Sequence, residues 1–399
     1  MADKHAEKAS MGDETGSFMP NRRLFIQLAG AAGGTALASG AATAQSAEEM
    51  LEDVELPDED ERPLVRLVQT GGTIASTEEA ADEGYSLSEE ADAIVESVPE
   101  LEHFVDIEIV EAAQKGSPSL LVEDYVSVAK AAKQAEEDGA AGVIVTHGTN
   151  TIEEDAYFND LVLDLDIPVV FVGAMRPADA IVADGPSNLL LAARLVTRNE
   201  FHLSDEPSGV YALLNETVHA ARDIMKSDTW SLETFSSGSP GPIARFTDDE
   251  ILIYREPGSY SSNLSDCDLE ATPERTVPIV ATGAGAEAPL MEQAVNGKYD
   301  ADGFAVQHSG RGGTSPAISD AVEATLDAGI PVVSSTRNFD GPASPSDEEG
   351  TDVSMEDLPV WKARIHLIVA LTMTSDLEEI RETVEAGKYG TAIVPTSTL

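Results

Sequence analysis

Two short segments combine threonine hydroxyls with glycine: Thr-Gly-Gly-Thr at residues 70–73 and Thr-His-Gly-Thr-Asn-Thr at residues 146–151. A threonine hydroxyl can attack a carbonyl carbon when a neighbouring base accepts its proton. Glycine allows a sharp backbone turn and lets a ligand approach backbone N–H groups. Either segment alone is more typical of a plain turn, so the chemistry depends on what else lies beside them.

The elements that would position these turns are strands of a parallel sheet. Both segments follow apolar runs, at 64–68 and 142–145, and similar runs recur at 168–172 and 209–214. A helical pattern covers 121–138 and ends at Gly139. Alternating strands and helices predict an α/β fold with a parallel sheet. Ligands bind at the carboxyl ends of such strands, where both threonine segments fall.

The pattern divides the mature chain into two α/β domains. It weakens between residues 246 and 278, where turn-forming and acidic residues gather. Shorter apolar runs then return at 277–280, 303–307 and 331–335. We therefore expect a larger N-terminal parallel-sheet domain at 63–250, a linker at 251–275 and a smaller C-terminal domain at 276–399.

Charge narrows the function classes. The 399 residues include 73 Asp and Glu against 24 Lys and Arg, a net charge of −49, with 42% hydrophobic residues. This field repels nucleic acids and anionic membranes. Disordered acidic chains lack such apolar content, so we expect a folded protein adapted to high salt, from a halophilic archaeon. A single cysteine, Cys267, excludes an intrachain disulfide and a multi-cysteine metal cluster.

The amino terminus resembles an export signal. Arg22 and Arg23 precede a weakly apolar run, and Ala-Thr-Ala at 42–44 offers a cleavage site. Paired arginines before such a run are typical of a twin-arginine signal at 1–44. An acidic linker follows at 45–62. These features predict an extracellular or cell-surface protein without a stable membrane anchor. The alternative is a disordered tail with a chance arginine pair.

Five segments, taken in order, resemble the bacterial-type L-asparaginase (asparaginase/glutaminase) family, from about residue 65 to the end of the chain. The two signature-like segments are Gln-Thr-Gly-Gly-Thr-Ile-Ala (69–75) and Val-Thr-His-Gly-Thr-Asn-Thr-Ile-Glu-Glu (145–154). The others are Val-Gly-Ala-Met-Arg-Pro (172–177), Ala-Asp-Gly-Pro-Ser-Asn (183–188) and Ala-Arg-Asp-Ile-Met-Lys (221–226). The match is dense in the first domain and loose in the second.

The resemblance implies a two-domain fold, a homotetramer and hydrolysis of a small amide by two-step acyl transfer. Ammonia is released, with no metal and no cofactor. Thr73 would be the nucleophile, Tyr85 would help accept its proton, and Thr149 would pair with Lys226. The implied substrate-binding residues are Gly72, Ser117, Gly148, Asn150 and Ala174. Ser117 would bind the substrate carboxylate and the Ala174 carbonyl the leaving amide.

Several of these residues have structural alternatives. Tyr85 lies in an acidic segment and could be a surface tyrosine, and Lys226 could be a solvated lysine. His147 precedes the threonine, but the family reaction does not use it, so packing against a neighbouring strand is expected. A structural role is also favoured for His308, and Cys267 is expected to be inert because no histidine is near it in sequence.

Three positions depart from the family pattern. Asn150 stands where the family has the aspartate that pairs with the substrate α-ammonium, and Pro118 replaces a glutamine. The asparagine expected near residues 283–286 is absent. An exported binding relative with weak or no catalysis is therefore the alternative. The archaeal tRNA-dependent amidotransferase subunit is disfavoured by the signal and by the negative charge.

Overall fold

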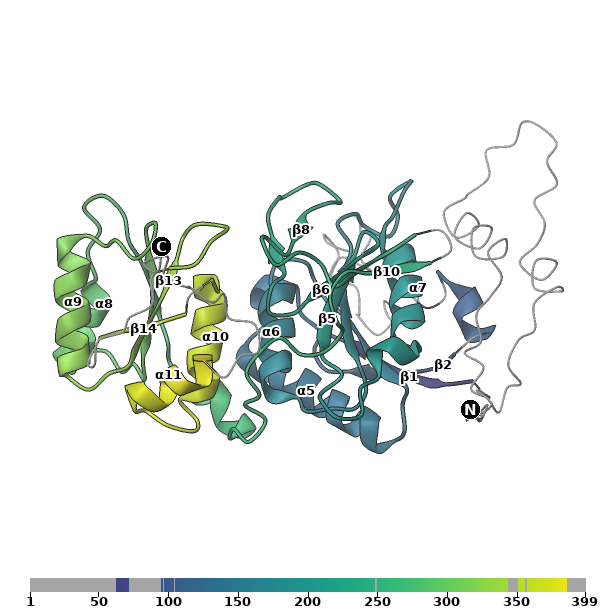
Figure 1. Cartoon of the computed structure of the whole chain (residues 1–399), viewed down its shortest axis with the longest axis horizontal. Coiled ribbons are helices and arrows are strands. Elements are labelled where there is room, and N and C mark those ends of the chain that lie inside the picture. Colours follow the sequence, from purple (N-terminus) through teal and green to yellow (C-terminus); the bar gives the residue numbers. More distant parts are fainter. Residues whose placement is uncertain are drawn as a thin grey trace, which may run out of the picture.

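The computed structural model describes residues 62–71, 95, 97–103, 105–247, 250–343, 351–355 and 357–385. The predicted signal and almost all of the acidic linker lie outside these residues, as do Gly72, Thr73 and Tyr85. The described chain forms two adjoining α/β parts, each with its own sheet (Figure 1). The predicted two-domain α/β fold is confirmed.

The larger sheet has eight strands in the order β10-β9-β6-β5-β4-β3-β1-β2. Its parallel half contains β1 (Leu64–Gln69), β2 (Asp106–Glu111), β3 (Gly142–Thr146), β4 (Val169–Val172) and β5 (Val210–Leu214). Antiparallel pairing adds β6 (Thr217–Ala220), β9 (Ala244–Phe246) and β10 (Ile251–Ile253). The sheet is thus mixed, and β10 occupies the start of the segment expected to be a linker.

Helices cover both faces of this sheet, which explains the continuous apolar runs of its central strands. On one face, Val143 and Val145 pack with α5 (Val122–Glu137) and α6 (Ile152–Val162). On the other face, Ile144 packs with α7 (Gly185–Val196). Short 3-10 helices lie at Pro99–His103 (η2), Ser117–Ser119 (η3), Asn199–Phe201 (η4) and Leu269–Glu274 (η5). A separate two-stranded ribbon pairs β7 (Met225–Lys226) with β8 (Phe235–Ser236).

The smaller domain is a parallel four-stranded sheet in the order β11-β12-β13-β14. Its strands are Ile279–Ala281 (β11), Phe304–His308 (β12), Val332–Thr336 (β13) and Val353–Ser354 (β14). One face is covered by α8 (Pro289–Val295) and α9 (Pro316–Asp327). On the other lie α10 (Val360–Ala370) and α11 (Leu377–Glu385). Helix α10 lies between this sheet and α6, so it joins the two domains (Figure 1).

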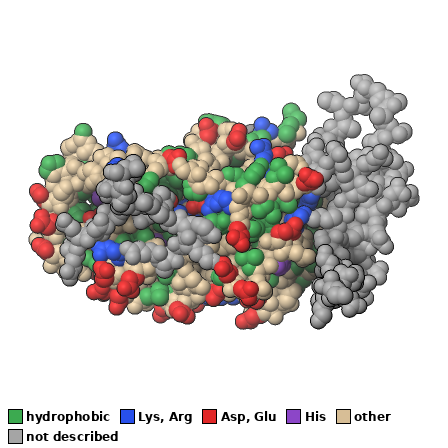
Figure 2. All heavy atoms as spheres, in the orientation of Figure 1, with side chains coloured by type: hydrophobic (Ala, Val, Ile, Leu, Met, Phe, Trp, Pro, Cys, Tyr) green, Lys and Arg blue, Asp and Glu red, His purple; other side chains and the backbone are tan. Residues whose placement is uncertain are grey.

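Acidic side chains are scattered over the visible face of both domains, with fewer basic ones among them (Figure 2). The scattered positions agree with the sequence, in which the acidic residues behind the net charge of −49 are spread along the chain and not confined to one segment. Among the helices of the described ranges, none has the length and apolarity needed to cross a bilayer.

Candidate functional site

The candidate site is built first from the turn after β3. Gly148 and Ser117 lie so close that a Cβ atom on Gly148 would stand 2.6 Å from the Ser117 Oγ. The buried Ser117 accepts the Asn150 backbone N–H at its Oγ (3.3 Å) and the Thr151 hydroxyl at its carbonyl oxygen (2.9 Å). Three predicted substrate-binding residues, Ser117, Gly148 and Asn150, are thus brought together.

The turn after β1 adjoins the turn after β3. The buried Thr70 donates its hydroxyl to the Thr146 carbonyl oxygen over 3.1 Å. Gly71 has a φ of +91°, and a Cβ there would come within 2.7 Å of the Lys115 carbonyl oxygen. Only glycine adopts this conformation without strain and fits this space. Gly72 and Thr73 follow directly in the chain, but their geometry lies outside the described residues.

Lys226 brings an amine to the second threonine. Its Nζ lies 2.8 Å from the Thr149 Oγ1 and 3.0 Å from the Asn150 Oδ1. Burial lowers the pKa of this half-buried lysine, and the charge of Glu153 partly opposes that effect. A lysine with a lowered pKa can release its proton and then act as a base towards the hydroxyl that it contacts.

Glu153, which sequence reasoning missed as a functional residue, fixes the backbone of this lysine. The Lys226 N–H donates to the Glu153 Oε2 over 3.0 Å. Burial raises the pKa of Glu153, and nearby lysine charges oppose that shift. The sequence offered one signal for Glu153, which is its place in the Ile-Glu-Glu sequence at the start of α6. A glutamate that is buried there needs a partner, because buried glutamates without one are rare.

The turn after β4 carries Ala174, which is buried. Asp184 accepts the backbone N–H groups of Met175 and Arg176, each over 2.9 Å, and the Asn188 side-chain amide donates to the Gly173 carbonyl oxygen over 2.9 Å. The segments at 172–177 and 183–188 therefore shape one turn together. A Cβ at Gly173 would lie 2.8 Å from the His147 carbonyl oxygen, which places this turn against the turn after β3.

His147 points into the protein. Its ring centroid lies 5.9 Å from that of Phe171 on β4, so it packs against the neighbouring strand as expected. The His147 Nε2 stands 3.1 Å from the Asp155 Oδ2, and both side chains are fully buried. Burial raises the pKa of Asp155, while His147 opposes the shift. This pair links the turn after β3 to the first turn of α6.

Two other candidates lie apart from this cluster. His308 ends β12 in the second domain, 4.0 Å from a carboxylate oxygen of Asp352, and burial lowers its pKa. Cys267 is half-buried beside η5, and burial raises the pKa of its thiol. A thiol with a raised pKa is a poor nucleophile. Among the described residues, no group of His, Cys, Asp and Glu has an arrangement that could hold a metal ion.

The departures from the family pattern have clear positions. Asn150 is exposed, and its only acceptor oxygen is engaged by Lys226. Pro118 lies in η3 beside Ser117 and has no N–H or side-chain donor. Residues 283–286 form a turn between β11 and α8, closed by a 3.2 Å hydrogen bond from the Ala286 N–H to the Gly283 carbonyl oxygen.

The two α/β domains place a hydroxyl–lysine pair at the strand ends, an arrangement suited to proton transfer in hydrolysis. Residues 64–259 match the asparaginase N-terminal family model, and residues 276–384 match the glutaminase/asparaginase C-terminal domain model. The chain therefore belongs to the asparaginase/glutaminase family of amidohydrolases, as the sequence motifs indicated.

Individual relatives agree with this membership. The chain is 32% identical over 335 residues to L-asparaginase 2 of Bacillus subtilis, covering 80% of this chain and 85% of that protein. It is 30% identical to the glutaminase-asparaginase of Acinetobacter glutaminasificans, covering 79% of this chain and 97% of the relative. The crystal structure of a probable cytoplasmic L-asparaginase from Campylobacter jejuni superposes with a TM-score of 0.71 at 30% identity, covering 81% and 99% of the two chains.

Proposed function

We propose that the protein hydrolyses the side-chain amide of L-asparagine, or of a related small molecule, to the carboxylate and ammonia through a threonine nucleophile. The observation that carries this proposal is the 2.8 Å contact between the Lys226 Nζ and the Thr149 Oγ1. A lysine whose pKa burial lowers, placed against a hydroxyl at the end of a parallel strand, is suited to proton transfer.

In the proposed reaction the Thr73 oxygen attacks the amide carbon, helped by Tyr85, and forms an ester. The carbon–nitrogen bond breaks, and the hydroxyl proton leaves with the nitrogen as ammonia. Water then attacks the ester, with neutral Lys226 drawing a proton through the Thr149 hydroxyl, and Thr73 is restored. This sequence of steps needs neither a metal nor a cofactor.

Asn150 sets the expected substrate preference. A substrate α-ammonium would meet a neutral amide whose oxygen already accepts from Lys226. Neutral hydrogen bonds are roughly half as strong as charge-assisted ones. We therefore propose weak activity on free L-asparagine. The alternative is a binding relative with little or no catalysis, and the changes at Asn150 and Pro118 favour it.

We also propose export by the twin-arginine route to the cell surface or medium, adaptation to high salt, and a homotetramer. Export is supported by Arg22 and Arg23 before the weakly apolar run, and salt adaptation by the charge of −49. The tetramer rests on the family resemblance alone, and light scattering of the purified protein in molar salt measures it.

Ammonia release in molar KCl tests the activity. The substrates are L-asparagine, L-glutamine, Nα-acetyl-L-asparagine and a simple primary amide. Lys226→Met is the inactive comparison, and Lys130→Met is its control, because Lys130 is half exposed and pairs with Glu270 at the surface. The proposal is supported if the wild type releases ammonia, Lys226→Met releases none, and Lys130→Met releases it as the wild type does. Tight amide binding without release favours the binding relative.

A further inference from the structure

A fully buried lysine of the second domain contacts the backbone that leads to Lys226. Lys362, in the first turn of α10, has no exposed surface. Its Nζ donates hydrogen bonds to the carbonyl oxygens of Ala221 (2.8 Å), Arg222 (2.8 Å) and Ile224 (2.6 Å). All three donor protons of the ammonium are used, and the last carbonyl lies two residues before Lys226.

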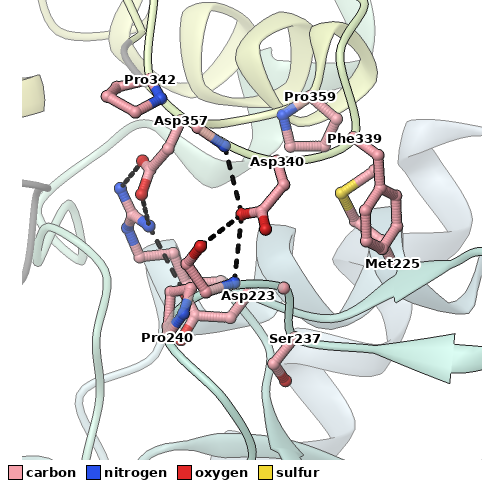
Figure 3. Close-up of a pocket in the computed structure, with 13 residues that line it drawn as sticks. Asp223, Met225, Ser237, Pro240, Phe339, Asp340, Pro342, Asp357 and Pro359 are labelled. Carbon is pink, nitrogen blue, oxygen red and sulfur yellow. Dashed lines mark hydrogen bonds and ion pairs between the residues drawn. The ribbon is translucent and has the colours of Figure 1, made fainter.

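An ion pair from the second domain also contacts the segment at 221–224. The Arg222 guanidinium pairs with the Asp357 carboxylate over 2.7 Å, across the interdomain pocket that Figure 3 shows. In the same pocket, Asp340 accepts the Ser239 N–H (3.1 Å) and hydroxyl (2.7 Å). Two side chains of the second domain, Lys362 and Asp357, thus contact residues 221–224 of the first domain.

Helix α6 completes the surroundings of Lys362. Its Nζ stands 5.7 Å from the Tyr157 ring centroid. Burial lowers the pKa of Lys362 to about 8, and the carboxylate of Glu153 opposes that shift. Asp223 and Asp160 act in the same direction as Glu153, and Arg222 in the opposite one. The charge of Lys362 in turn favours the ionised form of Glu153, which accepts the Lys226 N–H.

The stability of the folded protein does not by itself explain why the charged Lys362 is buried. Exchanging a buried ionic group for an apolar side chain of similar volume is often neutral or stabilising. A buried ammonium, however, needs backbone carbonyl oxygens arranged around it in one geometry. An apolar side chain has no such requirement. Lys362 therefore also restricts residues 221–224 to a conformation that presents three carbonyl oxygens to its ammonium.

We propose that Lys362 is a positioning residue: from the second domain it fixes residues 221–224 and thereby sets the Lys226 amine against the Thr149 hydroxyl. The catalytic part of this inference rests on the proposed function, whereas the conformational part does not. Docking of the second domain is then a condition for a complete site in the first.

Lys362→Met removes the ammonium and keeps an unbranched side chain that is one atom shorter. Tyr157→Phe is the matched control, because it removes a 3.0 Å hydrogen bond to His366 in the same α6–α10 interface, whereas the hydrogen bonds of Lys362 to residues 221–224 remain. Hydrogen–deuterium exchange of the 221–226 peptide, kcat and KM are measured for both variants in molar KCl. Lys362→Gln, which keeps a neutral donor, is the second variant if the methionine variant does not fold.

We expect faster exchange of 221–226 in Lys362→Met and wild-type exchange in Tyr157→Phe. We also expect kcat to fall at least about tenfold while KM changes less than about threefold, because alignment for proton transfer is lost and not substrate binding. Lys362→Gln should fall between wild type and Lys362→Met. Wild-type exchange and kcat in the lysine variants, or equal losses in Tyr157→Phe, would overturn the proposal. If the wild type releases no ammonia from any amide, the proposed function fails, and the exchange comparison still decides the role of Lys362.

Discussion

Asn150→Asp changes two properties of the site at once. The new carboxylate would stand where the Asn150 Oδ1 now lies, 3.0 Å from the Lys226 Nζ. Two unit charges at about 3 Å attract by about 1.4 kcal/mol in a water-like dielectric, which suits an exposed position. That energy corresponds to about one unit in the pKa of Lys226. The carboxylate would also offer a charged partner to a substrate α-ammonium, which is worth about 1.5–3 kcal/mol.

The two effects separate in a pH profile with two substrates. We expect the acid limb of kcat/KM to move up by about one pH unit with both substrates, because Lys226 must lose its proton to act as a base. Below about pH 8, where the α-amine of L-asparagine is still protonated, the kcat/KM ratio of L-asparagine to Nα-acetyl-L-asparagine, which lacks the ammonium, should rise about tenfold to hundredfold. Ammonia release between pH 6 and 11 in molar KCl measures both.

Asn263→Asp is the control. It adds the same charge at an exposed position, and its Oδ1 can still accept the Ser265 N–H as Asn263 does now, over 3.0 Å. An unchanged acid limb in Asn150→Asp would refute the contact between Lys226 and residue 150 as a determinant of proton transfer. An equal gain with both substrates would refute the assignment of this position to the α-ammonium.

Three further predictions follow from the site, the charge and the core. Thr149→Ala and Thr73→Ala should each abolish ammonia release without changing the far-UV circular dichroism, and near wild-type turnover in Thr73→Ala would end the nucleophile assignment. Transfer from molar KCl to about 10 mM salt should abolish cooperative thermal unfolding, because the Debye length grows from about 3 Å to about 30 Å; an unchanged Tm would contradict salt adaptation. Burial lowers the pKa of His366 to about 4. The unfolded chain therefore binds a proton that the folded chain does not, and stability falls from about pH 6.5 towards pH 4. Asp160, whose pKa burial raises to about 6, acts in the opposite direction, so His366→Gln is compared with wild type at each pH; its denaturation midpoint should depend less on pH.

The sequence predicted those parts of the fold that have strong local patterns. The runs at 142–145 and 209–214 are buried on both faces, and their continuous apolar character marks β3 and β5. The antiparallel strands β9 and β10 were missed because each has only three residues, too few for alternation to show. Pairing, and not local propensity, makes them strands: β9 pairs with β6 of the preceding hairpin, and β10 pairs with β9 at the edge of the sheet.

Among the residues of the candidate site, too, the sequence predicted some and missed others. Gly148 and Thr149 were identified because a motif carries them, and Ser117 because the family resemblance implies it; the structure brings all three together with Lys226. Lys362 was not identified, although a lysine inside the apolar sequence Val-Trp-Lys-Ala-Arg-Ile was a visible signal. Its partners are backbone carbonyls of another domain, and no residue type in the sequence indicates a carbonyl that needs a donor.

The hydrogen bonds of Lys362 also bear on when the enzyme becomes complete during synthesis. Its contact with Ile224 spans 138 residues of chain, so a ribosome releases the whole threonine-bearing domain well before the lysine that fixes residues 221–224. Domains generally fold in the order in which they emerge. An unfinished chain would therefore present the Thr149 turn without a fixed Lys226. Under the proposed role of Lys362, amide hydrolysis begins only once the chain has been synthesised beyond this lysine.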